Sequence, residues 1–216
     1  MVLMATIATF IDRLSKVPKY WDGKNSILEM RDSGNTQWRQ MEWIGFYFQF
    51  LCEKYLSAVM QIPGPRYGRV EFDGFLDIPW DFKAHSINTL SRGVIINDSE
   101  AIASGVLEYG NVGLILAMGE AEYNDVDRSF QEWHSNIKGE ISAYVKRRIA
   151  RGGWSRRRKV AFGLRQILLL QLSDDTLVKT GTFQAGFRNS NDNPRRSKVL
   201  LHLNNMEDEV IGRIDF

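Results

Sequence analysis

A carboxylate and an amine alternate with bulky apolar residues near position 80. Asp81 and Lys83 are separated by Phe82, and Trp80 precedes them. On a β-strand this alternation places Asp81 and Lys83 on one face and the two aromatic residues on the other. A charged pair among buried residues costs several kcal/mol to desolvate unless a bound cation compensates. The stretch therefore predicts a cation site beside an amine, with a purely structural Asp–Lys pair as the alternative.

A second carboxylate is expected from the residues just upstream. The segment from Arg69 to Asp73 alternates between charged and apolar side chains, and positions 74–79 are enough to turn the chain. If the turn is centred near Asp77, Asp73 and Asp81 become cross-strand neighbours with Cβ atoms about 5 Å apart. Two acids at that separation can share a cation. Asp77 would lie about 13 Å from Asp81 along an extended strand, so Asp73 is the preferred partner.

An acid, a short gap, and a second acid two residues before a lysine resemble the active-site motif of the PD-(D/E)xK nucleases. This superfamily contains most type II restriction endonucleases. The resemblance rests on Asp73 and on Asp81-Phe82-Lys83, with Phe72 where the family has a proline. It implies that Asp73 and Asp81 hold Mg²⁺ and that Lys83 lies beside the attacking water.

The same resemblance implies an α/β fold of the restriction-endonuclease type, with a mixed central sheet flanked by helices in a single domain over residues 1–216. It also implies Mg²⁺-dependent, sequence-specific hydrolysis of phosphodiester bonds in double-stranded DNA. Each chain would carry one catalytic site, whereas a duplex has two strands to cut. We therefore expect a homodimer, whose two-fold symmetry implies a short palindromic site. A helical acid reaches the metal in several members of the family, which makes Glu42 a candidate third carboxylate. An exposed glutamate on a helix face is the alternative for Glu42.

A localised positive patch suggests the nucleic-acid contact. Positions 141–173 contain nine Lys or Arg residues and no Asp or Glu, although the net charge of the chain is only +2. Such clusters are typical of phosphate-binding surfaces, with a solvated helix end as the alternative. The polar segment 187–198 suits base-edge contacts. The candidate DNA-binding residues are Arg147, Arg151, Arg156, Arg157, Arg158, Lys159, Arg188 and Asn189.

Composition narrows the class of protein. A hydrophobic fraction of 44% with no run of eighteen apolar residues excludes a membrane span, and a single cysteine excludes an internal disulfide. The first residues lack a secretory pattern, so a cytoplasmic location is expected. Two other functions fit the same residues. One is a non-catalytic DNA-binding protein that uses the patch 146–159, and the other is a repair or junction nuclease on the same scaffold.

Periodicity and capping residues predict the elements that carry these groups. The expected helices are 3–14, a long one over 36–60, a short one from Ser99 to Tyr109, and one over 125–149. The expected strands are a hairpin around Asp77, a fully buried strand over 112–118, and strands over 177–187, 198–203 and 210–214. A second Asp-x-Lys triplet, Asp22-Gly23-Lys24, is predicted to form a turn.

Overall fold

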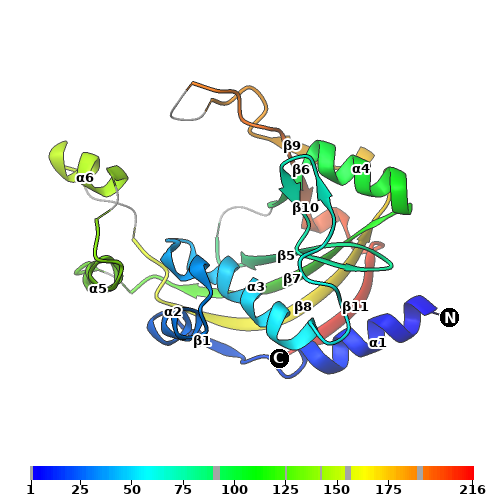
Figure 1. Ribbon diagram of the computed structural model, residues 1–216, viewed down its shortest axis with the longest axis horizontal. Coiled ribbons are helices and arrows are strands. Elements are labelled where there is room, and N and C mark those ends of the chain that lie inside the picture. Colours follow the sequence, from blue (N-terminus) through cyan, green and yellow to red (C-terminus); the bar gives the residue numbers. More distant parts are fainter. Residues whose placement is uncertain (1, 90–92, 125, 142, 154–156, 189–191) are drawn as a thin grey trace.

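The computed structural model describes residues 2–89, 93–124, 126–141, 143–153, 157–188 and 192–216 (Figure 1). The helices are α1 Val2–Leu14, α2 Gly23–Asp32, α3 Trp43–Leu56, α4 Ser99–Tyr109, α5 Ser129–Lys138, α6 Ala143–Ala150 and α7 Asp174–Val178, with short 3-10 turns η1 Thr36–Arg39 and η2 Leu203–Asn205. The strands are β1 Tyr20–Asp22, β2 Arg66–Tyr67, β3 Val70–Glu71, β4 Gly74–Leu76, β5 Ile78–Ser86, β6 Gly93–Asp98, β7 Val112–Glu122, β8 Ala161–Leu172, β9 Gly181–Phe183, β10 Lys198–His202 and β11 Val210–Asp215.

A mixed sheet forms the centre of the molecule. Its strand order is β1-β8-β7-β5-β4, and β11 pairs with β8 beside β1. β5 runs parallel to β7, whereas β7 and β8 are antiparallel. The chain passes from β5 to β7 through β6 and α4, as a parallel pair requires a crossover. The expected α/β class with a mixed sheet flanked by helices is confirmed.

Alternate side chains of β7 and β8 enter two apolar clusters on opposite faces of the sheet. Ile115 and Ile167 belong to the cluster that includes α1, α2 and α3, whereas Leu114 and Leu168 belong to the cluster that includes α4, β6 and β10. Burial on both faces explains the long apolar runs in these two strands. The expected strand over 112–118 is confirmed, and it continues to Glu122.

A smaller sheet and one helix cover the second face. β6, β10 and β9 pair in that order, and β10 runs antiparallel to both neighbours. The Asp98 side chain accepts a hydrogen bond from the Glu100 amide and caps α4, which ends at Gly110 in the left-handed conformation. The predicted α4 is therefore confirmed at both ends.

Several element predictions were wrong because local breaks interrupt the apolar periodicity. The expected helix over 36–60 divides into η1 and α3, since Gln40 is extended and Glu42 stands before the first turn of α3. The expected helix over 125–149 divides at Gly139, whose φ of 70° ends α5. The expected strand over 177–187 is α7 and the shorter β9. The Asp22 triplet begins α2, which Asp22 caps, and is not a turn.

The first helix is part of the core. Ile7, Phe10 and Leu14 of α1 are buried in the cluster that contains α3 and β11. Because these three apolar side chains already pack within the chain, they are not available for a dimer contact. Among the described residues, no helix is both long and apolar enough to cross a bilayer.

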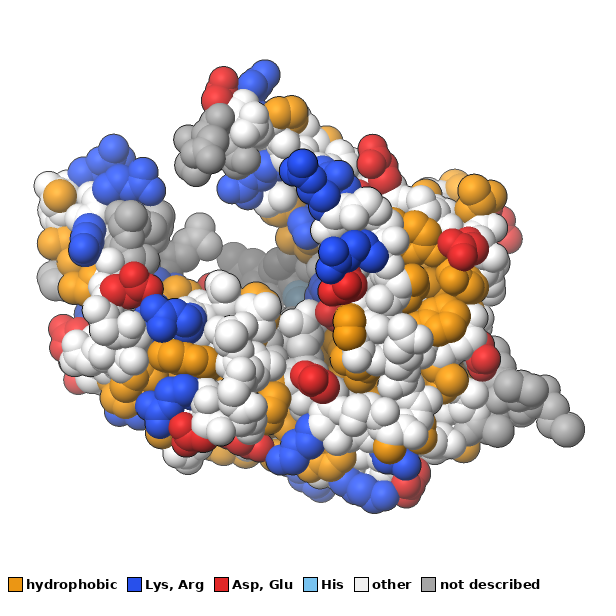
Figure 2. All heavy atoms as spheres, in the orientation of Figure 1, with side chains coloured by type: hydrophobic (Ala, Val, Ile, Leu, Met, Phe, Trp, Pro, Cys, Tyr) orange, Lys and Arg blue, Asp and Glu red, His pale blue; other side chains and the backbone are white. Residues whose placement is uncertain are grey.

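Two projecting parts of the chain flank a hollow above the sheet (Figures 1 and 2). We call them the α6 arm, residues 143–153, and the β9–β10 arm, residues 181–188 and 192–202. Lys and Arg side chains lie on the surface of both arms (Figure 2). The exposed basic residues are Lys146, Arg147, Arg148 and Arg151 on the α6 arm and Arg188, Arg195 and Arg196 on the β9–β10 arm.

His134 on α5 makes the stability of the fold depend on pH. Its ring is buried, and its Nε2 lies 2.9 Å from the Trp38 carbonyl oxygen, which can only accept, so Nε2 carries the proton. Burial lowers the pKa of His134 to about 4 from 6.5, and the nearby cations Lys138, Arg158 and Arg39 act in the same direction. The unfolded chain therefore takes up this proton first as the pH falls.

We expect the free energy of unfolding to fall, on the order of 2 kcal/mol, as the pH drops from about 6.5 to about 4. Well above pH 6.5 His134 contributes no pH dependence, because the ring is then neutral in both the folded and the unfolded state. Denaturant unfolding of the wild type and of His134→Gln, measured at pH 7 and pH 4.5, tests this. The variant should lose less stability between the two pH values. Equal losses would assign the acid sensitivity to other groups.

Candidate active site

The hairpin around Asp77 forms as predicted. β4 and β5 are antiparallel, with Gly74 opposite Trp80 and Leu76 opposite Ile78, so the turn is centred on Asp77. Asp77 itself is exposed and has a φ of 61°. Extending the same register by one residue sets Asp73 opposite Asp81. Asp77 lies at the tip of the turn, which supports Asp73 as the first acid.

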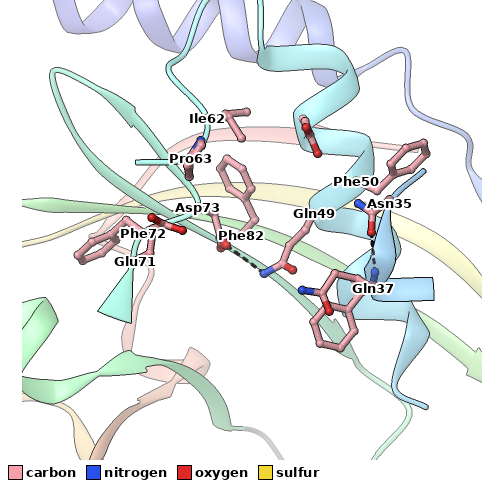
Figure 3. Close-up of a pocket in the computed structure, with 12 residues that line it drawn as sticks. Asn35, Gln37, Gln49, Phe50, Ile62, Pro63, Glu71, Phe72, Asp73 and Phe82 are labelled. Atoms are coloured by element: carbon pink, nitrogen blue, oxygen red, sulfur yellow. Dashed lines mark hydrogen bonds between the residues drawn. The ribbon is translucent and has the colours of Figure 1, made fainter. Parts of the chain in front are cut away.

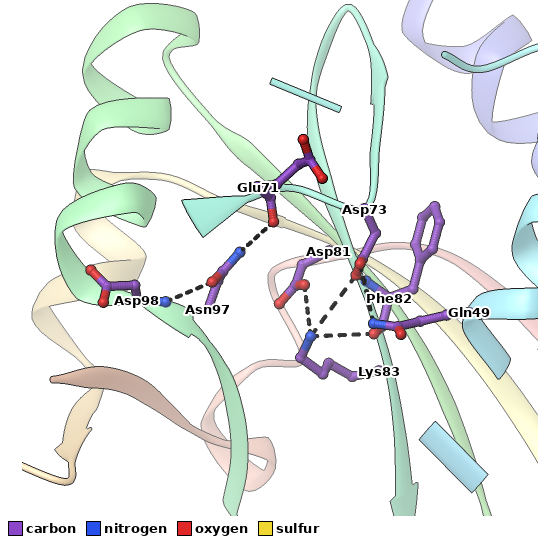
Figure 4. A network of polar contacts seen from close by, with 8 residues as sticks. All are labelled: Gln49, Glu71, Asp73, Asp81, Phe82, Lys83, Asn97 and Asp98. Carbon is purple, nitrogen blue, oxygen red and sulfur yellow. Dashed lines mark hydrogen bonds and ion pairs between the residues drawn. The ribbon is translucent and has the colours of Figure 1, made fainter. Parts of the chain in front are cut away.

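Asp73 completes the hydrogen bonding of β5 where β4 stops. The pairing of β4 with β5 ends at Gly74 and Trp80. Beyond this point the Phe82 amide is the next one of β5 on the edge that faces β4. It donates to Asp73 Oδ2 at 2.6 Å. Because a buried amide without a partner is costly, the sequence needs an acceptor here, and the Asp73 carboxylate supplies it. The contact holds Asp73 beside the Asp81–Lys83 pair (Figure 4).

Asp81 and Lys83 form a close, largely buried ion pair. Lys83 Nζ lies 2.7 Å from Asp81 Oδ1 and 3.9 Å from Asp73 Oδ2. The Asp81 side chain is only 3% exposed, whereas those of Asp73 and Lys83 are 23% and 27% exposed. Asp81 Oδ2 is buried and has no hydrogen-bond partner among the described residues. The site therefore contains one carboxylate oxygen that the rest of the described chain leaves unsatisfied.

The three charges perturb one another. Burial and the adjacent Asp81 carboxylate raise the pKa of Asp73 to about 7, although Lys83 and the Phe82 amide act in the opposite direction. Burial alone would lower the pKa of Lys83, but the two carboxylates outweigh it and raise that pKa. The amine therefore remains protonated at neutral pH. An ammonium beside two acids can neutralise negative charge on a bound anion or water.

Glu42 does not join the two aspartates. Its side chain is 74% exposed, and its nearest charged partner is Lys159, whose Nζ lies 3.7 Å away. In the part of the chain that the structure describes, no three acid, histidine or cysteine side chains gather into a metal-binding group. Glu42 and Lys159 instead line a cavity of about 330 Å³ together with Lys83 and Gln49. The structure thus places Glu42 near the site but outside the pair of acids.

Gln49 is a side chain of the candidate site that was not predicted from the sequence. It projects from α3 and donates from Nε2 to Asp73 Oδ1 at 3.1 Å (Figures 3 and 4). α3 packs against β5, which brings this amide to the hairpin. The available signal was a polar stripe on an apolar helix, since Glu42, Gln49 and Glu53 follow at intervals of seven and four residues.

A further contact fixes the segment before Asp73. Asn97 at the end of β6 donates from Nδ2 to the Glu71 carbonyl oxygen at 3.4 Å (Figure 4). Glu71 also accepts from Arg66 across the β2–β3 pair. These contacts connect the smaller sheet to the strand that leads to Asp73. The position of the first acid therefore depends on elements from both faces of the central sheet.

The predicted DNA-binding residues occupy different parts of the molecule. Arg147 and Arg151 are exposed on the α6 arm, and Arg157 is exposed in the irregular segment that leads to β8. Arg158 and Lys159 are partly buried in that segment. Arg188 is exposed on the other arm, and its Nη1 donates to the Asp192 carbonyl oxygen at 2.6 Å. Arg156 and Asn189 lie outside the described residues.

The residues present fit a small divalent cation. Mg²⁺ is commonly bound by one or two carboxylates, with waters and substrate phosphate oxygens completing its shell. Asp73 and Asp81 supply two carboxylates side by side, and Asp81 Oδ2 is the unsatisfied buried oxygen. The donor set is entirely oxygen, as a hard cation prefers. These two residues are therefore the ones that would hold Mg²⁺.

Comparisons with protein-family models, with curated proteins and with solved structures found no match for this chain.

Proposed function

We propose that this protein is a Mg²⁺-dependent endonuclease that hydrolyses phosphodiester bonds in double-stranded DNA, with the fold and activity of a type II restriction endonuclease. The observation that carries the proposal is the grouping of Asp73, Asp81 and Lys83. Two carboxylates and an ammonium meet at the end of a hairpin, and a buried carboxylate oxygen is left without a partner.

The residues divide the work of hydrolysis as follows. Asp73 and Asp81 would hold the cation, which supplies Lewis-acid polarisation of the phosphate and a more acidic bound water. Lys83, held 2.7 Å from Asp81 Oδ1, orients the attacking water and neutralises charge that develops on the phosphate oxygens. Gln49 holds the Asp73 carboxylate in place through a 3.1 Å hydrogen bond. Its role is one of positioning.

The hollow between the two arms is where we place the DNA. Basic side chains are exposed on both arms, and the cavity that Lys83 lines opens between α3 and the residues leading to β8. Arg147, Arg148 and Arg151 would bind phosphates on one side, and Arg195 and Arg196 on the other. Backbone contacts of this kind position a duplex without reading its sequence. The homodimer and the palindromic site stay predictions.

A digest of plasmid and phage DNA tests the proposed function. We expect discrete fragments in the presence of Mg²⁺ and intact DNA when EDTA replaces it, because the proposed reaction needs the cation to polarise the phosphate and to acidify the bound water. Sequencing the fragment ends would give the site. DNA that stays intact with Mg²⁺ or Mn²⁺, while a gel-shift assay still detects binding, would favour the non-catalytic DNA-binding alternative. Cutting confined to branched substrates would favour the junction nuclease.

A further inference from the structure

A second cavity adjoins the site on the other side of Gln49. Its volume is about 300 Å³, within the range of small-ligand pockets. It shares Gln49, Asp73 and Phe82 with the active site, and it extends away from them toward η1 (Figure 3). Nothing in the proposed hydrolysis uses this space. A ligand held there would lie directly beside a phosphate bound at Asp73 and Asp81.

The walls of this cavity combine flat apolar surfaces with amide groups. Phe46 and Phe50 lie one turn apart on α3, so that both reach the same side of the helix. Asn35 and Gln37 reach the cavity from the other wall. The Gln37 side chain is exposed, and the Gln37 backbone amide donates to Asn35 Oδ1 at 2.8 Å (Figure 3). The pocket thus offers aromatic faces together with side-chain carboxamides that can donate and accept hydrogen bonds.

The acceptors favour a ligand that carries an amino group. Gln49 Nε2 is used by Asp73, which leaves Gln49 Oε1 as an acceptor at the cavity. The exposed Glu53 carboxylate lies one turn further along α3 and lines the same cavity. Phe50 is partly buried and stacks on Tyr47 with ring centroids 6.0 Å apart, so its position is set by packing. Aromatic faces with carboxamides beside them are the usual means of holding an unstacked nucleobase.

We propose that this cavity binds one unstacked nucleobase, with an exocyclic amino group, of the strand whose phosphate lies at Asp73 and Asp81. The base stacks on Phe50 while Gln37, Gln49 and Glu53 bind its edge. The basic arms would contact phosphates, and phosphate contacts carry no sequence information. Binding an extruded base beside the scissile phosphate would let the protein select DNA by its sequence. The placement of that strand's phosphate at Asp73 and Asp81 rests on the proposed function.

The test compares two ligands that differ only in the base. Isothermal titration calorimetry with Mg²⁺ measures the dissociation constants of dAMP and of 2-deoxyribose 5-phosphate. We expect dAMP to bind the wild-type protein about tenfold more tightly, the effect of stacking one base on an aromatic side chain. The double variant Phe50→Leu/Gln37→Ala should bring the two constants together while leaving that of the sugar phosphate unchanged. Leucine retains apolar volume at position 50, which protects the core.

A matched control and a separate activity assay make the result decisive. Phe187 is exposed and lies outside the cavity, so Phe187→Leu should keep the wild-type preference for dAMP. Equal affinities for the two ligands, or no binding of dAMP to the folded wild-type protein, would overturn the base pocket. Plasmid cleavage is measured independently. Preferential binding of dAMP without plasmid cleavage would support the base pocket and reject the nuclease proposal. Plasmid cleavage without a preference for dAMP would support the nuclease proposal and reject the base pocket.

Discussion

Replacing Asp81 by asparagine, or Lys83 by methionine, is expected to reduce Mg²⁺-dependent DNA cleavage by on the order of a thousandfold. Asp81→Asn keeps the shape of the side chain but removes the charge of a carboxylate that is 3% exposed and 2.7 Å from Lys83 Nζ. Lys83→Met removes the ammonium that faces both acids. Asp73→Asn should match them. The measurement is the rate of plasmid linearisation under single-turnover conditions, together with calorimetric titration of Mg²⁺.

Asp77→Asn is the matched control for these variants. It makes the same chemical change four residues from both acids, and asparagine tolerates the left-handed backbone that Asp77 adopts at φ 61°. We expect wild-type cleavage from it. Since an unpaired buried charge costs several kcal/mol, each variant must be assayed below its own melting temperature. Wild-type cleavage by Asp81→Asn would reduce the ion pair to a structural role. An inactive Asp77→Asn with an active Asp73→Asn would reassign the first acid.

Neutralising the α6 arm is expected to give the largest change in DNA affinity. Arg147, Arg148 and Arg151 are exposed on this arm, beside the hollow. Each phosphate contact contributes about 0.9 to the slope of log K against log salt concentration. Changing all three residues to glutamine should therefore reduce that slope by about three units. Fluorescence anisotropy of a labelled duplex over a salt series provides the measurement.

A control triple variant separates local contacts from net charge. Lys16, Arg31 and Lys54 carry the same total charge, and each lies in an ion pair on the helical layer that contains α1, α2 and α3. Their replacement by glutamine should leave the slope unchanged. An equal effect of the two triple variants would show that the α6 arm acts only through net charge. Among the other basic residues predicted to bind DNA, Arg158 is less suitable for this test because it is partly buried.

The catalytic candidates were predictable because they depend on short-range structure. Alternation around Asp81 and the symmetry of the hairpin about Asp77 involve residues less than ten positions apart, so the sequence alone placed Asp73 opposite Asp81. The caps of α4 at Asp98 and Gly110 were predictable for the same reason. In each case the side chain that determines the structure is close in sequence to the backbone that it affects.

Long-range packing decided the rest. The apolar run of β8 is compatible with a strand or with a buried helix. Its pairing with β7, β1 and β11 makes it a strand, through partners about 40 to about 140 residues away in the sequence. Gln49 rather than Glu42 reaches Asp73 because α3 packs on β5 with this face toward the hairpin. The sequence alone identified two acids and a lysine as the candidate cation-binding and catalytic groups. Only the tertiary structure determined which polar side chain of α3 meets them and which basic residues border the hollow, because both depend on contacts between distant segments that local periodicity does not encode.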